Sequence, residues 1–455
     1  MNNESRITDI VDFNPPRKLK KGQIAPFIDM AALPTNERDI VEITEKAFTG
    51  GAKFRNGDTL FARITPCLEN GKTGKVSNLS DEVIGHGSTE FIVMTAKDSE
   101  IDEDYVYYLA RLPEFRKFAQ MRMTGTSGRQ RVSWQDLAEF TFAFPEPEKR
   151  KAAGVFLKTI DDKIQLNTQT NQTLEQIAQA IYKSWFVDYE PTRAKATVLA
   201  AGGNEEEAET AAMTAISGKN AADLAALKQD QPTRYQQLAD LAAAFPAALV
   251  PADDFGEIPE GWEAATLGEI CDMKNGYAFK SADWTESGIP VIKIGSVKPM
   301  LVEVEGNGFV DANFATSKPE FLVQPGDILV GLTGYVGEVG RMPHGRNAML
   351  NQRVAKFVPK KIDSAHTYYN FVYCLARQDT FKRFAEGNAK GSAQANISTK
   401  ELLKYPTVIA DSTIHKAFES FTAALMEKIL LHSSISWQLA KARDLLLPKL
   451  LNGEI

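Results

Sequence analysis

The 455-residue sequence has few of the residues that build metal centres or disulfide frameworks. Its three cysteines, Cys67, Cys271 and Cys374, lie far apart, and its five histidines are scattered. An odd number of cysteines without zinc spacing indicates reduced thiols and no bound metal. No run of about eighteen apolar residues occurs, and residues 1–8 are too polar for a signal peptide. We therefore expect a cytoplasmic protein.

The sequence also lacks the motifs of an enzyme. The nearest is Asn14-Pro15-Pro16, because amino-methyltransferases hold the target amine with an (Asn/Asp)-Pro-Pro-aromatic loop. Arg17 stands where the aromatic residue would be, and no glycine-rich loop for S-adenosylmethionine follows a nearby strand. A basic loop is the better interpretation, so we expect no catalytic residue and no cofactor bound by this chain.

The excess of acidic residues is confined to one segment. The net charge is -7, but residues 201–260 alone contain eleven acidic and three basic residues. The rest of the chain is therefore close to neutral, and the acidic balance does not argue against a nucleic-acid partner. This alanine-rich segment is expected to form either small solvated helices or a mobile linker.

Residues 149–188 are typical of one long helix with a coiled-coil seam, in which apolar or small residues recur in alternating steps of four and three. The seam positions are Ala153, Leu157, Ile160, Ile164, Asn167, Asn171, Leu174, Ala178, Ile181 and Trp185. A helix of this length spans about 60 Å at 1.5 Å per residue, which is too long for one ordinary domain to bury. The helix therefore needs a partner.

The partner is in the same chain, because a second seam follows 265 residues later. Its positions are Phe418, Thr422, Leu425, Ile429, His432, Ser436, Leu439, Arg443, Leu446 and Leu450. Only Arg443 fits the seam badly. The register continues upstream, where Leu109-Ala110-Arg111 returns as Leu375-Ala376-Arg377. The chain is therefore an internal duplication. Antiparallel pairing of the helices would bring Asn167 and Asn171 near His432 and Ser436.

The predicted fold class is α+β, with two duplicated α/β domains separated by two long helices that pair as an antiparallel coiled coil. Strands are expected at 24–30, 59–64 and 90–94, and a helix at 105–121. The expected domains are 1–147 and 258–410, the helices 148–190 and 411–455, and the acidic insert 191–257.

Several short motifs accompany the paired domains and long helices. They are Ile258-Pro259-Glu260-Gly261-Trp262, Asn275-Gly276-Tyr277-Ala278-Phe279-Lys280, Trp185-Phe186-Val187-Asp188, Leu450-Leu451-Asn452-Gly453, and the glycine-containing loops before Val132-Ser133 and Ile397-Ser398. With these motifs the chain resembles the DNA-specificity subunit of type I restriction-modification systems. The resemblance implies two target-recognition domains, each reading one half of a bipartite, asymmetric DNA site. It also implies that the helices dock two modification (methyltransferase) subunits and that restriction subunits complete the complex. S-adenosylmethionine, ATP and magnesium would belong to those partners.

The polar residues of both halves are consistent with this function, because Arg, Lys, Asn and Gln read base edges and contact phosphates. The candidates in the first half are Arg17, Lys18, Lys20, Lys21, Arg63, Lys75, Arg122, Arg129, Gln130 and Arg131. Those in the second half are Lys274, Asn275, Tyr277, Lys280, Lys293, Arg341, Arg346, Gln352, Arg353, Lys390, Ser392, Gln394 and Asn396. The loops 124–131 and 387–396 are the strongest pair, because the duplication makes them equivalent while their sequences differ. The alternative is a non-catalytic coiled-coil scaffold whose two heads bind ligands other than DNA.

Overall fold

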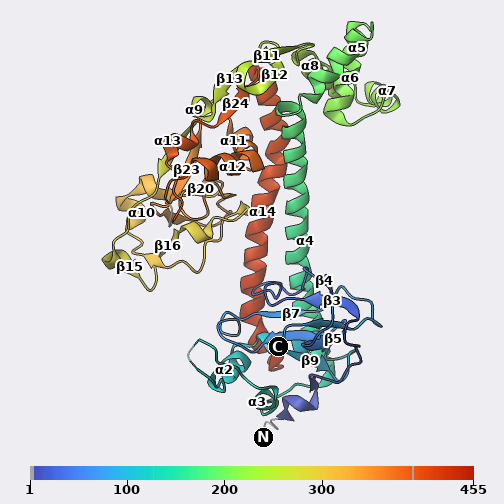
Figure 1. Ribbon diagram of the computed structural model, residues 1–455, viewed down its shortest axis with the longest axis vertical. Coiled ribbons are helices and arrows are strands. Elements are labelled where there is room, and N and C mark those ends of the chain that lie inside the picture. The colour runs from blue at the N-terminus through green and yellow to red at the C-terminus, as the bar shows by residue number, and fades with distance from the viewer. Residues whose placement is uncertain (1–4, 127, 392–393) are drawn as a thin grey trace. The chain divides into compact units, whose positions relative to one another are not determined.

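The computed structural model describes residues 5–126, 128–391 and 394–455. The chain forms two compact units, residues 1–167 with 435–455 and residues 168–434. Two helices of 40 residues each, α4 (Pro147–Phe186) and α14 (Ser412–Leu451), contribute to both units (Figure 1). The two long helices predicted from the seams are therefore present.

The first unit contains two four-stranded sheets. One has the order β2-β9-β6-β7, with bounds Val11–Phe13, Phe91–Ala96, Thr59–Ala62 and Thr73–Lys75. The other has the order β4-β3-β8-β5, with bounds Thr44–Ala47, Ile24–Ile28, Gly85–Gly87 and Ala52–Phe54. Strands β6 and β9 are buried along their whole length and rich in aromatic and β-branched residues, which suits a covered sheet. The three strands expected from the sequence, β3, β6 and β9, are confirmed.

The single helix expected at 105–121 is two helices, so that prediction was wrong. Helix α1 (Glu103–Arg111) ends before Leu112, and α2 (Pro113–Met121) begins at the proline. A residue that precedes proline is pushed out of the helical region, and Leu112 has the extended ψ of 129°. Proline itself suits the first position of the next helix. Most residues of α1 are buried, whereas most residues of α2 are exposed or half-buried.

The remaining strands and α-helix of the first unit are short. They are β1 (Ser5–Arg6), which pairs with β10 (Thr141–Phe142), and helix α3 (Trp134–Ala138).

The second unit repeats the strand order of the first unit's β2-β9-β6-β7 sheet and adds one strand. Its sheet has the order β14-β23-β20-β21-β17, with bounds Cys271–Asn275, Val354–Pro359, Ile328–Gly331, Val339–Arg341 and Met300–Leu301. A second five-stranded sheet has the order β15-β18-β16-β22-β19, with bounds Trp284–Thr285, Phe309–Val310, Ile289–Ile292, Ala348–Leu350 and Leu322–Val323. Helices α11 (Tyr369–Ala376) and α12 (Asp379–Asn388) take the places of α1 and α2. The internal duplication is therefore a duplication of fold.

The second unit also contains further short strands and α-helices. They are β13 (Glu263–Thr266), which pairs with β24 (Pro406–Ile409), β11 (Leu249–Ala252), which pairs with β12 (Gly256–Pro259), and the short helices α9 (Leu267–Ile270), α10 (Phe314–Ser317) and α13 (Thr399–Leu402).

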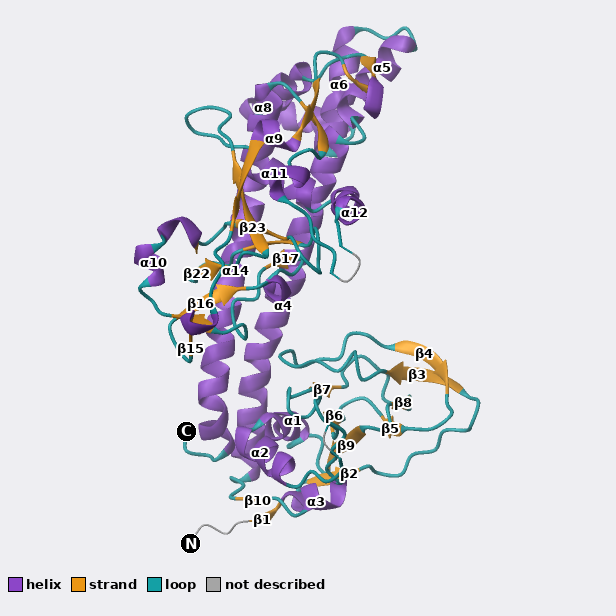
Figure 2. Cartoon of the chain, turned by 60° about the vertical axis from the view of Figure 1, so that its left-hand side comes forward, coloured by secondary structure: helices purple, strands orange, loops and turns teal. Residues whose placement is uncertain are grey.

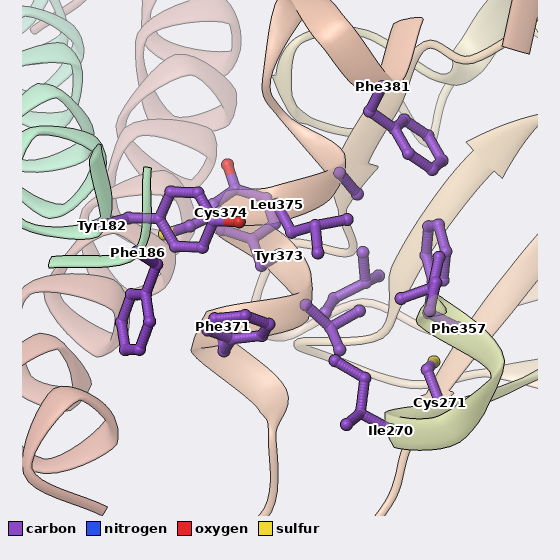
Figure 3. Packing of buried hydrophobic residues seen from close by; sticks show 14 of the residues in the cluster. Tyr182, Phe186, Ile270, Cys271, Phe357, Phe371, Tyr373, Cys374, Leu375 and Phe381 are labelled. Atoms are coloured by element: carbon purple, nitrogen blue, oxygen red, sulfur yellow. The ribbon is translucent and has the colours of Figure 1, made fainter. Parts of the chain in front are cut away.

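A large aromatic core holds the second unit to its part of the long helices. Tyr182 and Phe186 of α4 lie against Phe371 of α11, with ring centroids 5.3 and 4.9 Å apart (Figure 3). The core continues to Phe357 and Phe381, whose centroids are 6.2 Å apart. Each fully buried aromatic side chain contributes about 1.5 to 3 kcal/mol by the hydrophobic effect. The α4 segment is thus an integral part of this unit.

The alanine-rich insert forms four helices within the second unit, which confirms one of the two structures expected for it. They are α5 (Glu190–Ala200), α6 (Glu205–Ser217), α7 (Ala221–Asp230) and α8 (Pro232–Ala244). Asn204 and Asn220 cap α6 and α7 by accepting a hydrogen bond from a backbone N–H, each over 3.0 Å. A small apolar core that includes Met213, Leu224 and Leu238 joins α6, α7 and α8. Most of the acidic residues of the segment lie on these helices, whereas Asp253 and Glu257 follow them on a 3-10 turn and on β12.

The long helices pair antiparallel in each unit. In the first unit, Lys149 near the start of α4 donates to the carbonyl of Gly453, just beyond the end of α14, over 3.2 Å. In the second unit, Trp185 near the end of α4 lies 6.1 Å from Phe418 near the start of α14, between ring centroids. Both contacts require opposite chain directions. The predicted antiparallel coiled coil is confirmed.

The polar layers expected in the middle of the seam are also present. Asn167 Nδ2 donates to Ser436 Oγ over 3.0 Å, and Asn171 Oδ1 lies 3.0 Å from His432 Nδ1. Asn171 Nδ2 also donates to the carbonyl of Ile429. Buried polar pairs of this kind fix the register of a coiled coil and lower its stability.

Replacing these four residues together with aliphatic ones, as N167L/N171L/H432L/S436A, is therefore expected to raise the melting temperature of the chain by several degrees. All four must change, because a single substitution would leave a buried partner unpaired at a cost of about 1 to 3 kcal/mol. Thermal unfolding followed by circular dichroism measures the effect, and N171L alone is the matched control, which should melt lower. A quadruple variant that melts below the natural chain would contradict the role assigned to these layers.

Candidate nucleic-acid interface

In the first unit, the ends of β2 and β6 lie at the same end of the β2-β9-β6-β7 sheet, whose strands are labelled in Figure 2, and the chain at Val132 joins them there. Asn14, which follows β2, donates its backbone N–H to Val93 and accepts from the Val93 N–H through its side chain. Arg63, which follows β6, donates its backbone N–H to the carbonyl of Glu90, and its own carbonyl accepts from Val132, each over 3.0 Å. These bonds tie the basic loop after β2, the end of β6 and the loop 124–131 into one surface.

The second unit builds the same surface from the equivalent segments. Leu332, which follows β20, donates its backbone N–H to the carbonyl of Arg353, and its carbonyl accepts from Ile397, each over 2.9 Å. Thr333 Oγ1 also donates to Asn396 Oδ1 over 2.8 Å. The backbone N–H of Gln352 donates to the carbonyl of Tyr277, which follows β14. Loop 387–396 is thereby held beside the loops at 275–280 and 351–353.

The two strongest candidate loops share one backbone design. Thr124 and Arg131 exchange two backbone hydrogen bonds of 2.9 Å, and Lys390 and Asn396 exchange two of 2.8 and 2.9 Å. Gly125 and Gly391 have φ values of +126° and +108°, and a Cβ on Gly391 would lie 2.7 Å from the carbonyl oxygen of Gln394. Both positions therefore require glycine. The loops present different side chains from one shared frame.

After each loop a serine caps a short helix. Ser133 accepts from the N–H of Asp136 before α3, and Ser398 accepts from the N–H of Glu401 before α13. The caps fix the downstream end of each loop.

Most of the predicted contact residues lie on these surfaces. The exposed ones are Lys18, Lys20, Lys21, Arg129, Lys274, Asn275, Lys280, Gln352, Arg353, Lys390, Gln394 and Asn396. Half-buried ones are Arg63, Arg122, Gln130, Arg131 and Tyr277. Two of these have fixed orientations: Arg122 lies over the ring of Phe118 at 3.5 Å, and Arg131 makes a forked ion pair with Glu90 at 2.7 to 3.0 Å. Ser392 lies outside the described residues.

Two predicted contacts are wrong, because their side chains lie in the interior. Lys75 is 1% exposed, and its Nζ donates to the carbonyl of Glu103 over 2.8 Å. Arg341 is 0% exposed and donates to the carbonyl of Met426. Lys75 lies on the edge strand β7 and Arg341 on the inner strand β21, but both side chains are buried, so neither can reach a phosphate. Burial lowers the pKa of Lys75, while the Glu103 carboxylate opposes that shift.

Three further candidates are held by internal partners. Arg17 is paired at 2.8 Å with Asp58, whose carboxylate is buried. Burial raises the pKa of Asp58, and the Arg17 guanidinium opposes this shift. Lys293 lies 3.9 Å above the ring of Trp284, and Arg346 pairs with Glu305 at 2.8 Å. For these residues, local structural roles compete with DNA contact.

The surface also contains residues that the sequence did not single out. A cleft of about 470 Å³ in the first unit is lined by Asn14, Pro15, Pro16, Arg17, Gly51, Ala52, Lys53, Arg63, Thr89 and Phe91. Lys53 belongs to it because β5 pairs with β8 in the second sheet of this unit. In the second unit, Tyr335 is 66% exposed beside the loop at 387–396. The internal repeat could have indicated Tyr335, because this residue directly follows 332–334, the segment equivalent to 63–65.

Among the helices described in the structure, none is long and apolar enough to cross a membrane. Within the same residues, no group of three or more His, Cys, Asp or Glu side chains is placed to hold a metal ion.

Comparison with known proteins agrees with the geometry. The family model described as "Type I restriction modification DNA specificity domain" matches residues 2–176 and 259–431. The type I restriction enzyme HindI specificity subunit of Haemophilus influenzae is 32% identical over 443 residues, which cover 94% of each chain. The EcoAI specificity subunit of Escherichia coli is 25% identical over 441 residues, which cover 87% of this chain and 72% of that protein.

A solved structure shares the fold. The crystal structure of a type I restriction-modification S subunit from M. genitalium has a TM-score of 0.50 and 16% identity, and the match covers 99% of this chain and 96% of that one. The two matched segments of the family model correspond to the two duplicated halves described above. On this evidence, the chain belongs to the family of DNA-specificity subunits of type I restriction-modification systems.

Proposed function

We propose that each half of the chain reads one part of a bipartite, asymmetric DNA site. The observation that carries this proposal is the pair of loop surfaces with one backbone frame and different side chains. Exposed Arg129 and half-buried Gln130 in the first half correspond to exposed Lys390, Gln394 and Asn396 in the second. Such groups make base-specific contacts in the major groove, whereas lysines such as Lys18 and Lys20 suit phosphates. Different side chains in one frame would select different bases.

The chain acts as the non-catalytic part of a larger complex. Its partners are double-stranded DNA, two modification (methyltransferase) subunits and restriction subunits. S-adenosylmethionine, ATP and magnesium are bound by those subunits, and this chain binds none of them. The alternative, a scaffold whose heads bind ligands other than DNA, is not favoured by membership of a DNA-specificity family. Sequencing of methylated bases in cells that express the complex should give one asymmetric motif in two parts, and a continuous palindrome would contradict the proposal.

The long helices dock the two modification subunits. Phe156 and Leu166 of α4 are 49% and 53% exposed, and their repeat equivalents on α14, Phe421 and Leu431, are 53% and 51% exposed. A partner protein that covers these exposed apolar side chains would remove them from water. Because the same pair of residue types occurs once on each helix at the same repeat positions, the surface suits two copies of one partner.

The variant F156E/L166E is expected to bind one modification subunit instead of two, and F421E/L431E likewise. A charge placed in an apolar interface should weaken the altered site at least about tenfold, or 1.4 kcal/mol. The stoichiometry of purified complexes, measured by native mass spectrometry, gives the result. L445E is the matched control, since Leu445 is 73% exposed on α14 but its repeat equivalent is Ala180. Two bound subunits in all three variants would show that docking uses another surface.

A further inference from the structure

Tyr335 is an exposed aromatic residue in the turn that joins β20 to β21, residues 332–338. Its side chain is 66% exposed, whereas the next residue, Val336, is 2% exposed and belongs to the large apolar core of the second unit. Val336 therefore anchors the turn in the core, and the ring of Tyr335 is left in solvent.

The turn that carries Tyr335 is fixed on both sides. The backbone N–H of Gly337 donates to the carbonyl of Gly331 over 3.0 Å. A Cβ on Gly331 would lie 2.4 Å from the carbonyl oxygen of Tyr335, so only glycine allows the turn to close this tightly. At the end of the turn, Glu338 pairs with Lys382 at 2.9 Å. A tyrosine on a fixed turn loses little conformational freedom when it binds a partner.

The same turn is attached to the loop 387–396. The backbone N–H of Gly334 donates to the carbonyl of Ala395 over 2.9 Å. A Cβ on Gly334 would lie 3.7 Å from Nε2 of Gln394, so the amide of Gln394 lies beside the residue that precedes Tyr335. An exposed aromatic ring and an exposed amide are thus presented next to each other.

The first half carries a different residue at this place. The backbone N–H of Thr65 donates to the carbonyl of Gln130 over 3.0 Å, which is the counterpart of the bond made by Gly334. The residue that follows, exposed Pro66, therefore corresponds to Tyr335. The two halves present a small ring and a large aromatic ring from one backbone frame, as two readers of different half-sites would.

The edges of DNA bases offer one apolar group that suits such a ring. In the major groove they present hydrogen-bond donors and acceptors, and the only apolar group among them is the C5-methyl of thymine. An aromatic face removes this methyl from water, while an amide such as that of Gln394 suits N6 and N7 of adenine. A phosphate, in contrast, would use only the hydroxyl of Tyr335.

We propose that Tyr335 determines specificity in the second half by placing its ring against the methyl group of a thymine in that half-site. This inference rests on the function proposed above, in which the loop 387–396 reads bases. Removing one methyl group from water favours the base that carries it by roughly fourfold over the same base without it.

DNA duplexes that contain the recognised site test this proposal when each thymine of either half-site is replaced in turn by deoxyuridine, which lacks only the methyl group. The rate at which the assembled complex methylates each duplex is the measurement. At one position of the second half-site, the complex with the natural chain should methylate the deoxyuridine duplex roughly fourfold more slowly.

Two variants identify the ring as the cause. Y335A should methylate the thymine and deoxyuridine duplexes at that position at equal rates, because no ring contacts the methyl. Y335F keeps the ring and should show the natural preference, which separates an apolar contact from a hydrogen bond made by the hydroxyl. Because Tyr335 is 66% exposed, Y335A should melt as the natural chain does.

Q394A distinguishes a failure of this inference from a failure of the proposed function. If Q394A broadens the second half-site but deoxyuridine has no effect at any position there, or Y335A keeps the natural preference, the inference about Tyr335 alone fails. A second half-site without thymine on either strand overturns it as well. If neither Q394A nor deoxyuridine changes recognition of that half-site, the loop 387–396 does not read bases and the proposed function fails too.

Discussion

Replacing Arg443 with leucine is expected to lower the free energy of unfolding by about 3 to 5 kcal/mol. Arg443 Nη1 lies 2.5 Å from Asp161 Oδ1, and both side chains are 6% exposed. Removing the guanidinium would leave the Asp161 carboxylate buried between α4 and α14 without its counter-charge. Urea unfolding measured by circular dichroism gives the change. The ion pair with Asp161 explains why a basic residue stands at this seam position.

The controls for this prediction compare the loss of a buried ion pair with the loss of an exposed one. Lys158 and Asp162 form an ion pair on α4 with side chains 38% and 45% exposed, so K158A should cost less than about 1 kcal/mol. Tyr108 also donates to Asp161 over 2.6 Å, and burial together with this carboxylate raises the pKa of Tyr108. The triple variant Y108F/D161L/R443L, which removes the whole polar group, should therefore recover most of the stability lost in R443L. A harmless R443L would show that water reaches Asp161.

Substitutions in the two equivalent loops are expected to relax different halves of the DNA site. R129A and Q130A should broaden the base preference of one half only, and K390A and Q394A that of the other. A bidentate base contact carries about 1 to 3 kcal/mol of discrimination, or roughly 5- to 150-fold between correct and wrong bases. Methylation of a library with both half-sites randomised, by the assembled complex, measures the preference at each position.

The basic loop after β2 supplies the control for the reading loops. K18A and K20A change exposed side chains that suit phosphates, so they should weaken methylation of all sequences alike and reduce its dependence on salt. R131A belongs neither to the base-reading nor to the phosphate-contacting substitutions. Arg131 is paired with Glu90, so its loss would loosen the loop itself. If R129A and K390A also acted uniformly on every sequence, the loops would be phosphate anchors and not readers.

The sequence by itself determined the long helices, their antiparallel partnership and the duplication. Steps of four and three residues place seam side chains on one helix face, and this depends only on local geometry. The repeat then located equivalent loops, whose glycines at 125 and 391 both have a positive φ. Pro113 also marks the break between α1 and α2, although the apolar pattern across it predicts one helix. Features of this kind depend on residues that are close together in the sequence, so the sequence predicts them.

Only the tertiary structure decided which basic residues face solvent. Arg17, Lys75 and Arg341 occur in polar stretches like those of Lys18 or Arg129, yet each is buried. The groups that hold them come from distant parts of the chain: Asp58 for Arg17, Glu103 for Lys75 and Met426 for Arg341. The same holds for Arg443, a misfit in its own helix that is matched by Asp161 of the other. Burial and charge pairing depend on which segments fold together, so no pattern of nearby residues could have distinguished a DNA contact from an internal ion pair.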